Sequence, residues 1–245
     1  MQGALFGAGP PRFDPALPGL RRWELAGGAW IEHHPDWLAG HTQLFEQLAS
    51  QVPWRSQRRQ MYDREVDVPR LVARAPEAGP IASLLRRLSE TLSRRYQWAL
   101  DSITLAHYRD GRDSVAFHGD KLGRLVDDSV VATVSVGAPR RFLLRPGAVL
   151  KASAGASLAF DLGWGDLFVM GGTCQRTWQH AVPKRAHADP RISIMFRPVL
   201  LGSQVLPDSQ VLPDSQVLLG SQVLPGSQVL PDSQVLPGIQ VLREP

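Results

Sequence analysis

From Ile103 onward the sequence consists of short apolar runs separated by turn residues. Eight runs of strand length lie at residues 103–108, 114–117, 130–136, 141–144, 157–160, 166–170, 177–182 and 191–196. Many short strands with turn signals between them favour two facing β-sheets with a site between them, as in a jelly-roll. The sequence therefore predicts a mainly β core.

Helical patterns precede these strands, so the expected fold class is mainly β with flanking helices (α+β). Asp36 can cap a helix over 37–51, whose apolar residues share one face. Pro80 stands at the start of a second amphipathic helix over 81–96. Residues 1–35 are rich in Gly and Pro and predict an extended arm, with a hairpin around 23–31.

His118 and Asp120 are separated by one residue. On an extended chain their side chains point to the same side and can hold one ion. His180, in a later strand, is the candidate third ligand. Two histidines and one carboxylate on one side of a metal leave other positions open, which is typical of non-haem Fe(II) enzymes that activate O2. A His-x-Asp tripeptide by itself also fits a surface turn.

Arg191 and Arg197 are six residues apart in the last predicted strand. An even separation places both guanidinium groups on one face of a strand. Arginine binds carboxylates through two parallel hydrogen bonds. The pair therefore suits a dicarboxylate cosubstrate, which carries an anion at each end.

These motifs together resemble the AlkB family of Fe(II)- and 2-oxoglutarate-dependent dioxygenases, over roughly residues 50 to 198. The amino-acid sequence of residues 108–111 and 171–178 is most similar to that of bacterial, actinobacterial-type members. The resemblance implies a double-stranded β-helix (jelly-roll) core and the cofactors Fe(II), 2-oxoglutarate and O2. It also implies oxidative dealkylation of alkylated nucleobases in DNA, with RNA as the alternative polymer. This direct-reversal repair releases an aldehyde, succinate and CO2.

The resemblance also implies a role for each matching residue. His118, Asp120 and His180 would hold the metal. Arg191, helped by the hydroxyl of Tyr108, would bind the distal carboxylate of 2-oxoglutarate, and Arg197 would lie by the carboxylate nearer the metal. Ser193 stands where many members have an asparagine that contacts 2-oxoglutarate, and Ala106 replaces a second one. Each replacement removes a hydrogen bond worth about 0.5–1.5 kcal/mol.

Aromatic and basic residues alternate between Pro53 and Arg70, a composition that suits stacking on bases and pairing with phosphates. In AlkB-like enzymes this segment forms a lid over the substrate, so Trp54, Tyr62 and Arg64 are candidate substrate residues, with Tyr62 stacking on a flipped base. An ordinary hairpin with a core aromatic is the alternative. Leu122 stands where repair members often carry an acid that reads the base.

Two other functions remain open at this point. Leu122 favours a 2-oxoglutarate dioxygenase that hydroxylates or demethylates a protein or a small molecule, whereas the basic segment 54–70 argues against it. A non-catalytic nucleic-acid-binding protein is disfavoured by the complete set of candidate ligands. Turnover of 2-oxoglutarate to succinate would exclude the non-catalytic protein, and comparing alkylated DNA, alkylated RNA and unmodified controls as stimulants would separate the two enzymes.

The composition restricts the binding partners and the cellular compartment that we expect. The net charge of +4 permits nucleic-acid binding. Cys174 is the single cysteine, so no internal disulfide is expected and a reducing cytoplasm is the predicted compartment. No apolar run is long enough for a membrane span, and no secretory signal is expected. No segment indicates a dimer interface, so we expect a monomer without an obligatory protein partner.

After Pro198 the sequence becomes repetitive. Seven copies of a six-residue unit, Ser-Gln-Val-Leu-Pro-Asp in the first, run from 203 to 244. Their low complexity and recurrent proline predict a disordered tail, although the repeated Val-Leu pairs could bind a partner. The expected organisation is therefore an arm and helix (1–52), a lid with its supporting helix (53–100), the core (101–198) and the tail (199–245).

Overall fold

The computed structural model describes residues 7, 9–61, 64–120, 122, 126–150, 156–199 and 239–241. For 57–61, 64–68 and 239–241 it describes the backbone alone.

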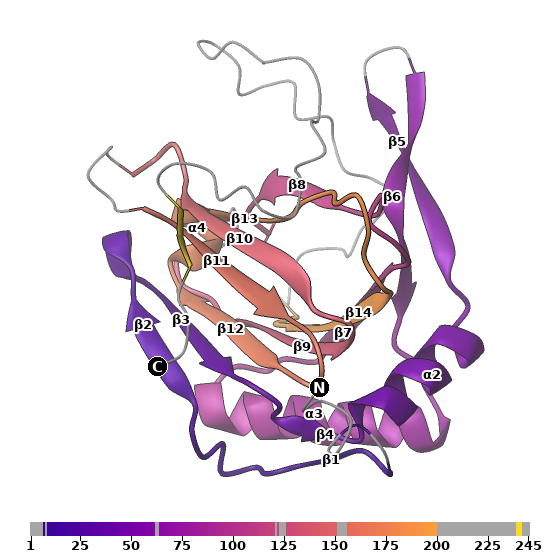
Figure 1. Cartoon of the computed structure of the whole chain (residues 1–245). Coiled ribbons are helices and arrows are strands. Elements are labelled where there is room, and N and C mark those ends of the chain that lie inside the picture. Colours follow the sequence, from indigo (N-terminus) through magenta and orange to yellow (C-terminus); the bar gives the residue numbers. More distant parts are fainter. Residues whose placement is uncertain are drawn as a thin grey trace.

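Two facing sheets form the body of the molecule (Figure 1). The major sheet has the strand order β2 (Arg21–Glu24), β3 (Ala29–His34), β12 (Leu167–Gly172), β9 (Val131–Gly137), β14 (Arg191–Arg197), β7 (Ser102–Tyr108), β6 (Arg64–Arg74) and β5 (Arg55–Met61). The minor sheet has the order β15 (Ile239–Val241), β11 (Ser157–Leu162), β10 (Arg140–Pro146), β13 (Trp178–Val182) and β8 (Val115–His118). Two short strands, β1 (Arg12–Phe13) and β4 (Leu38–Ala39), pair separately.

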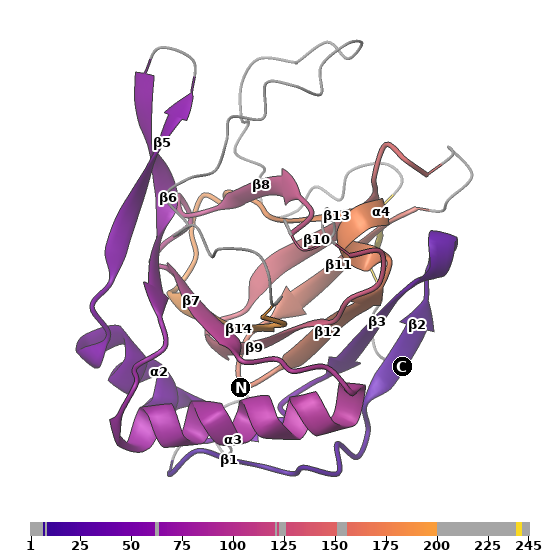
Figure 2. The ribbon, with the colours of Figure 1, turned by 180° about the vertical axis from the view of Figure 1, so that it is seen from behind.

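The two long helices cover one face of the major sheet. In Figure 2, α2 (His41–Gln51) and α3 (Gly79–Tyr96) lie along the face that points away from the minor sheet. Their buried leucines pack with the apolar side chains of β9 and β14 in one core cluster. A second cluster fills the space between the two sheets. The described residues also include the short helical segments η1 (Ala26–Gly28) and α4 (Cys174–Thr177).

Strand β14 shows how the sequence divides these two clusters. Ile192, Ile194 and Phe196 belong to the cluster beneath the helices. Because side chains alternate along a strand, Arg191, Ser193 and Arg197 point to the other face, into the space between the sheets. Burying polar residues in an apolar core costs free energy, so these residues indicate which face of β14 lines the interior surface where chemistry can take place.

Each of the eight predicted strands is present, as β7 to β14, and the predicted fold class and jelly-roll core are confirmed. The predicted hairpin around 23–31 is present as β2 and β3, joined through η1. The second predicted helix is α3, which ends where Gln97 adopts a left-handed conformation with φ of 56°.

The predicted start of the first helix is wrong. Leu38 and Ala39 form β4, and Gly40 has a φ of 71°, so α2 begins only at His41. Asp36 also has a positive φ, of 50°, and its amide donates to Asp166 instead of its side chain capping a helix. Glycine is needed at position 40 because a Cβ there would approach the backbone of Gly9 and Pro10.

The predicted lid is a continuation of the major sheet. Strands β5 and β6 form an antiparallel hairpin that joins the sheet through the pairing of β6 with β7. The hairpin projects past the body at the end of the molecule where β8 lies (Figures 1 and 2). Tyr62, the proposed stacking residue, lies outside the described residues.

Most of the predicted tail also lies outside the described residues, so its disorder stays a prediction. Its described strand β15 pairs in parallel with β11. Among the described residues, no helix has the length and apolar character that crossing a bilayer requires.

Candidate active site

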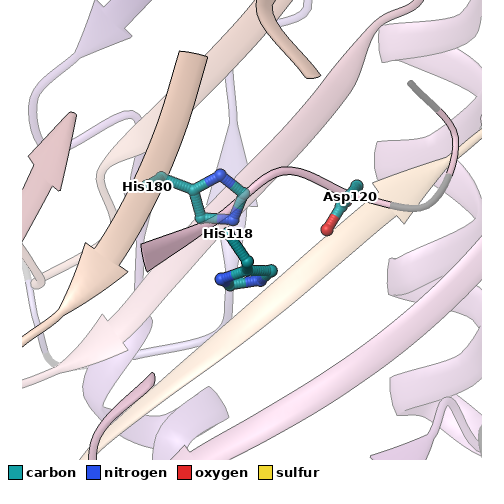
Figure 3. A group of neighbouring side chains, drawn as sticks. All are labelled: His118, Asp120 and His180. Carbon is teal, nitrogen blue, oxygen red and sulfur yellow. The ribbon is translucent and has the colours of Figure 1, made fainter. Parts of the chain in front are cut away.

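His118, Asp120 and His180 come together between the sheets, and we refer to them as the triad. His118 ends β8 and His180 lies in β13, and the two residues are register partners in the antiparallel pairing of these strands. One ligand atom from each member lies within 4.8 Å of the others. Figure 3 shows the carboxylate of Asp120 directed toward the two imidazole rings. The spacing of one residue and the distant histidine therefore converge as the sequence predicts.

The turn between His118 and Asp120 is fixed by the short helix α4. The backbone amide of Asp120 donates to Oε1 of Gln175 over 3.0 Å. Gly119 lies so close to this segment that a Cβ would meet the backbone carbonyl oxygen of Gln175. Sequence reasoning missed both contacts, because α4 is only four residues long and carries no apolar periodicity.

The two imidazoles are held in the form that binds metals. Nδ1 of His118 lies 2.8 Å from the carbonyl oxygen of Ala116, so a proton there leaves Nε2 free as a ligand. The ring of His180 stacks on Phe142, with centroids 5.5 Å apart. Burial, followed by the neighbouring His118, lowers the pKa of His180 to about 3, and burial also lowers the pKa of His118. Both rings are therefore neutral at physiological pH.

Asp120 is held as a carboxylate. Burial alone would raise its pKa, but the charge and hydrogen bond of Arg197, together with the two neighbouring histidines, outweigh this effect and hold the pKa well below its usual range. Nε of Arg197 donates to Oδ2 of Asp120 over 2.6 Å, and its Nη1 donates to Thr104 over 2.6 Å. Two neutral imidazoles and one carboxylate are the donor set of a non-haem Fe(II) site, so the residues present fit this metal.

Arg191 is a buried cation that lacks a carboxylate among the described residues. It is 1% exposed, and its Nη2 donates to the hydroxyl of Ser135 over 2.6 Å. Its Nε and Nη1 have no hydrogen-bond partner in the described part of the chain. Burial lowers the pKa of Arg191 to about 10, which leaves it charged at neutral pH. Because an unpaired buried charge costs several kcal/mol, an anion bound at this side chain would offset that cost.

The other predicted cosubstrate residues line the same surface. Tyr108 is the register partner of Arg191, and its ring lies 5.6 Å from the guanidinium carbon. Ser193 is buried between the two arginines and pairs in register with Ser135 on β9. The structure therefore brings Tyr108, Arg191, Ser193 and Arg197 to one interior face, with Arg197 nearest the triad through Asp120.

The candidate substrate residues are more dispersed. Leu122 is buried in the cluster between the sheets, close in sequence to Asp120. Arg64 begins β6 in the projecting hairpin, and its side chain is outside the description. Trp54 is not brought to the triad. Its indole donates to the carbonyl of Leu48 in α2 and its ring lies 5.1 Å from His107, on the helix-covered face of the major sheet.

Two further arginines face this region. Arg70 in β6 is partly buried, its Nε has no hydrogen-bond partner among the described residues, and its charge acts on both histidines of the triad. Arg140 is fully buried and donates to the carbonyls of Asp110, Asp113 and Pro183, which joins two loops beside Tyr108. Sequence reasoning singled out neither residue for the site, because burial depends on strand pairing that composition does not report.

Comparisons with known proteins agree with this donor set. The model of the 2OG-Fe(II) oxygenase superfamily matches residues 68–197. "Alpha-ketoglutarate-dependent dioxygenase alkB homolog 3" of Mus musculus is 30% identical over 173 residues, and that of Homo sapiens is 29% identical over 173 residues. Each alignment covers 64% of this chain and 60% of the relative.

Two further comparisons extend these findings. "DNA oxidative demethylase ALKBH2" of Homo sapiens is 27% identical over 183 residues, covering 65% of this chain and 69% of the relative. A weaker likeness, with a TM-score of 0.43 and 13% identity, links 74% of this chain to all of the chain in "The structure of OsALKBH1". The alignments with the alkB homolog 3 proteins span 60% of those proteins' length.

Proposed function

Because this chain belongs to the 2OG-Fe(II) oxygenase superfamily and is a member of its AlkB family, we propose that it removes alkyl groups oxidatively from nucleobases in DNA or RNA. Fe(II) and 2-oxoglutarate are the cofactors that this family implies. The observation that carries the proposal is the pairing of a complete metal-ligand triad with a buried arginine that lacks an anion among the described residues.

The triad would hold Fe(II) through the imidazoles of His118 and His180 and the carboxylate of Asp120. Fe(II) bound there would supply, with 2-oxoglutarate and O2, the oxidising chemistry that hydroxylates an alkyl carbon. The contribution of the chain is to position the reactants and to exclude water from them. The stacking of His180 on Phe142 and the contact of Asp120 with Gln175 fix two of the ligands before any cofactor arrives.

Arg191 would pair with the distal carboxylate of 2-oxoglutarate. Its unpartnered Nε, together with the second N–H of Nη2 beside it, can form the two parallel hydrogen bonds that a carboxylate accepts, and the bond from Nη2 to Ser135 already orients the guanidinium. Tyr108 would add a hydroxyl donor from the neighbouring strand. Hydrogen bonds to a charged group stabilise a complex by about 1.5–3 kcal/mol each, so Arg191 would dominate cosubstrate affinity.

Arg197 would act at the other end of the cosubstrate. It already donates to Asp120, so its guanidinium lies beside the metal ligands. From this position it would face the carboxylate nearer the metal and keep Asp120 ionised. Ser193, between the two arginines, would offer a hydroxyl where many members offer an amide.

The substrate would approach at the end of the molecule that carries the β5–β6 hairpin. This hairpin is rich in arginine and lies at the same end as β8, which carries His118. Flipping a base out of the stack costs a few kcal/mol, and stacking on one aromatic ring such as Tyr62 returns about 1–3 kcal/mol. Arg70, partly buried with an unpartnered Nε, would receive negative charge from the nucleic acid.

Release of the alkyl group needs no further catalytic group. Hydroxylation of a carbon attached to a base nitrogen gives a carbinol, which breaks its carbon–nitrogen bond to yield an aldehyde and the unmodified base. The accompanying oxidation of 2-oxoglutarate yields succinate and CO2.

A second function is favoured by one observation. Leu122 is apolar and buried in the cluster between the sheets, two residues after Asp120, where an acid would be needed to read the polar edge of a base. This environment also suits an apolar group of a protein or small-molecule substrate. The two functions share the cofactor chemistry and differ in the substrate that stimulates it.

The test is succinate formation from 2-oxoglutarate with four additions: methylated single-stranded DNA, methylated double-stranded DNA, methylated RNA and the unmodified oligonucleotides. We expect stimulation by a methylated nucleic acid and by none of the unmodified ones. Turnover that no nucleic acid stimulates would move the substrate to the protein or small-molecule class. Absence of turnover under all conditions would contradict the proposed enzyme.

A further inference from the structure

At one edge of the minor sheet, strand β11 is paired with a later segment of the same chain. Strand β11 pairs with β10 on one side and with β15 on the other. The register aligns Ser157 with Ile239 and Ala159 with Val241, in parallel. An edge strand without such a partner exposes a row of unpaired N–H and C=O groups, which other chains can use for pairing.

The position of β15 continues an apolar row on the outer face of the minor sheet. Ala181, Leu143 and Ala159 follow one another across β13, β10 and β11 and are 3%, 7% and 0% exposed. They form a core cluster separate from the one between the sheets. By register, Val241 occupies the next place in this row. The edge is thus matched to a strand with an apolar residue at that place.

The segment that forms β15 also differs from the other copies of the repeat. The six preceding copies begin with serine, whereas the seventh begins with Ile239. Five of those copies carry proline at the fifth position and one carries Leu219, whereas the seventh carries Arg243. Isoleucine favours strands, and proline removes an amide donor and is poorly tolerated within them. The seventh copy therefore combines both features that strand pairing favours.

We propose that the seventh copy, through Ile239–Val241, is a docking strand that covers the β11 edge of its own chain. Between Val199 and Ile239 there are 39 residues, so the strand and the edge are joined covalently within one chain. Such a link gives the strand an effective concentration of the order of millimolar. Docking within one chain is therefore favoured over docking onto a second copy in dilute solution.

The docking strand is remote from the proposed chemistry. In the minor sheet, β11 and β10 separate β15 from β13, which carries His180. At the usual strand spacing this is about 14 Å. Changes in the seventh copy are therefore expected to leave metal binding at the triad unchanged, which separates this inference from the proposed function.

The test is hydrogen exchange, followed by mass spectrometry, of a peptide covering Ser157–Leu162 in the full chain. Ile239→Ser together with Arg243→Pro converts the seventh copy to the common repeat. Because a hydrogen bond contributes about 1 kcal/mol, we expect exchange in this peptide to become roughly fivefold faster. A peptide covering Val131–Gly137 in β9 is the internal control and is expected to keep its protection.

A rescue variant sharpens the test. Adding Ser233→Ile and Pro237→Arg to the first double variant moves both features into the sixth copy, and protection of β11 is expected to return. Unchanged exchange of β11 in the first double variant would overturn the proposal. Loss of protection in the unmodified chain on dilution would also overturn it, because the occupant would then be a second copy.

Discussion

At the scale of single residues, Arg191 is the proposed anchor of the cosubstrate. We expect Arg191→Met to weaken 2-oxoglutarate binding by at least about tenfold, because the distal carboxylate loses charge-assisted hydrogen bonds. The same change should leave the cosubstrate-free protein equally stable or more stable, because it removes a buried cation whose Nε and Nη1 are unpartnered. Calorimetric titration with 2-oxoglutarate and thermal unfolding of both proteins measure the two effects.

Arg86→Met is a suitable control, since Arg86 is exposed on α3, away from the space between the sheets. It should change neither measurement. Strong destabilisation of the Arg191→Met protein without cosubstrate would indicate that Arg191 is a structural residue and would contradict its proposed role.

Gly119 tests the geometry of the triad. In Gly119→Ala the new Cβ would meet the carbonyl oxygen of Gln175, so the segment from His118 to Asp120 must shift. We expect weaker binding of Fe(II), or of Co(II) as its spectroscopic substitute, with an unfolding midpoint close to that of the wild type. Metal affinity that stays unchanged would show that α4 does not fix the ligands.

Residue-scale prediction from the sequence succeeded where spacing alone determines direction. His118 and Asp120 share a side because they are two residues apart, and the even spacing of Arg191 and Arg197 places both on the interior face. Gln175 was missed because its role depends on a backbone contact across 55 positions of sequence. The role of each residue in binding metal or cosubstrate stays a proposal.

At the scale of secondary-structure elements, α3 supports the major sheet. Leu88 is fully buried in the cluster beneath the helices. We expect Leu88→Ala to lower the free energy of unfolding by about 2–5 kcal/mol, because it leaves a cavity in this core. Glu90→Ala, at an exposed position of the same helix, should change it by less than about 0.5 kcal/mol. Urea unfolding of both variants compares them, and equal losses would contradict this packing.

Elements were predicted best where apolar periodicity was strong. All eight core strands and α3 lie within a few residues of their predicted ranges. The first helix begins later than predicted because the left-handed conformation of Gly40 and the pairing of β1 with β4 depend on tertiary contacts that leave no periodic signal. The pairing of the β5–β6 hairpin with the major sheet was not predicted either, because strand pairing between distant residues leaves no local sequence pattern.

At the scale of the whole molecule, family membership confirms the predicted enzyme class, an Fe(II)- and 2-oxoglutarate-dependent dioxygenase. The likeness to bacterial members, the cytoplasmic location and the monomeric state stay predictions. The net charge of +4 is compatible with a polyanionic substrate, and the arginines of the β5–β6 hairpin are the expected contacts.

The arginines of the β5–β6 hairpin should determine how strongly salt weakens nucleic-acid binding. Arg58→Gln with Arg59→Gln in β5 should reduce the slope of log affinity against log salt by up to about 0.9 per lost phosphate contact. Arg86→Gln with Arg87→Gln on α3 removes the same net charge from the other side of the sheet and should leave the slope nearly unchanged. Fluorescence anisotropy with a labelled oligonucleotide gives both slopes. Equal effects of the two pairs would place the contact surface elsewhere.

The most direct test of the central claim is formaldehyde release from a methylated oligonucleotide in the presence of Fe(II), 2-oxoglutarate and ascorbate, with succinate measured in the same samples. We expect the wild type to release formaldehyde and succinate in equal amounts, and His118→Ala to release neither. Succinate without formaldehyde would contradict nucleobase dealkylation while retaining the dioxygenase. Equal release by the wild type and by His118→Ala would contradict the proposed metal site.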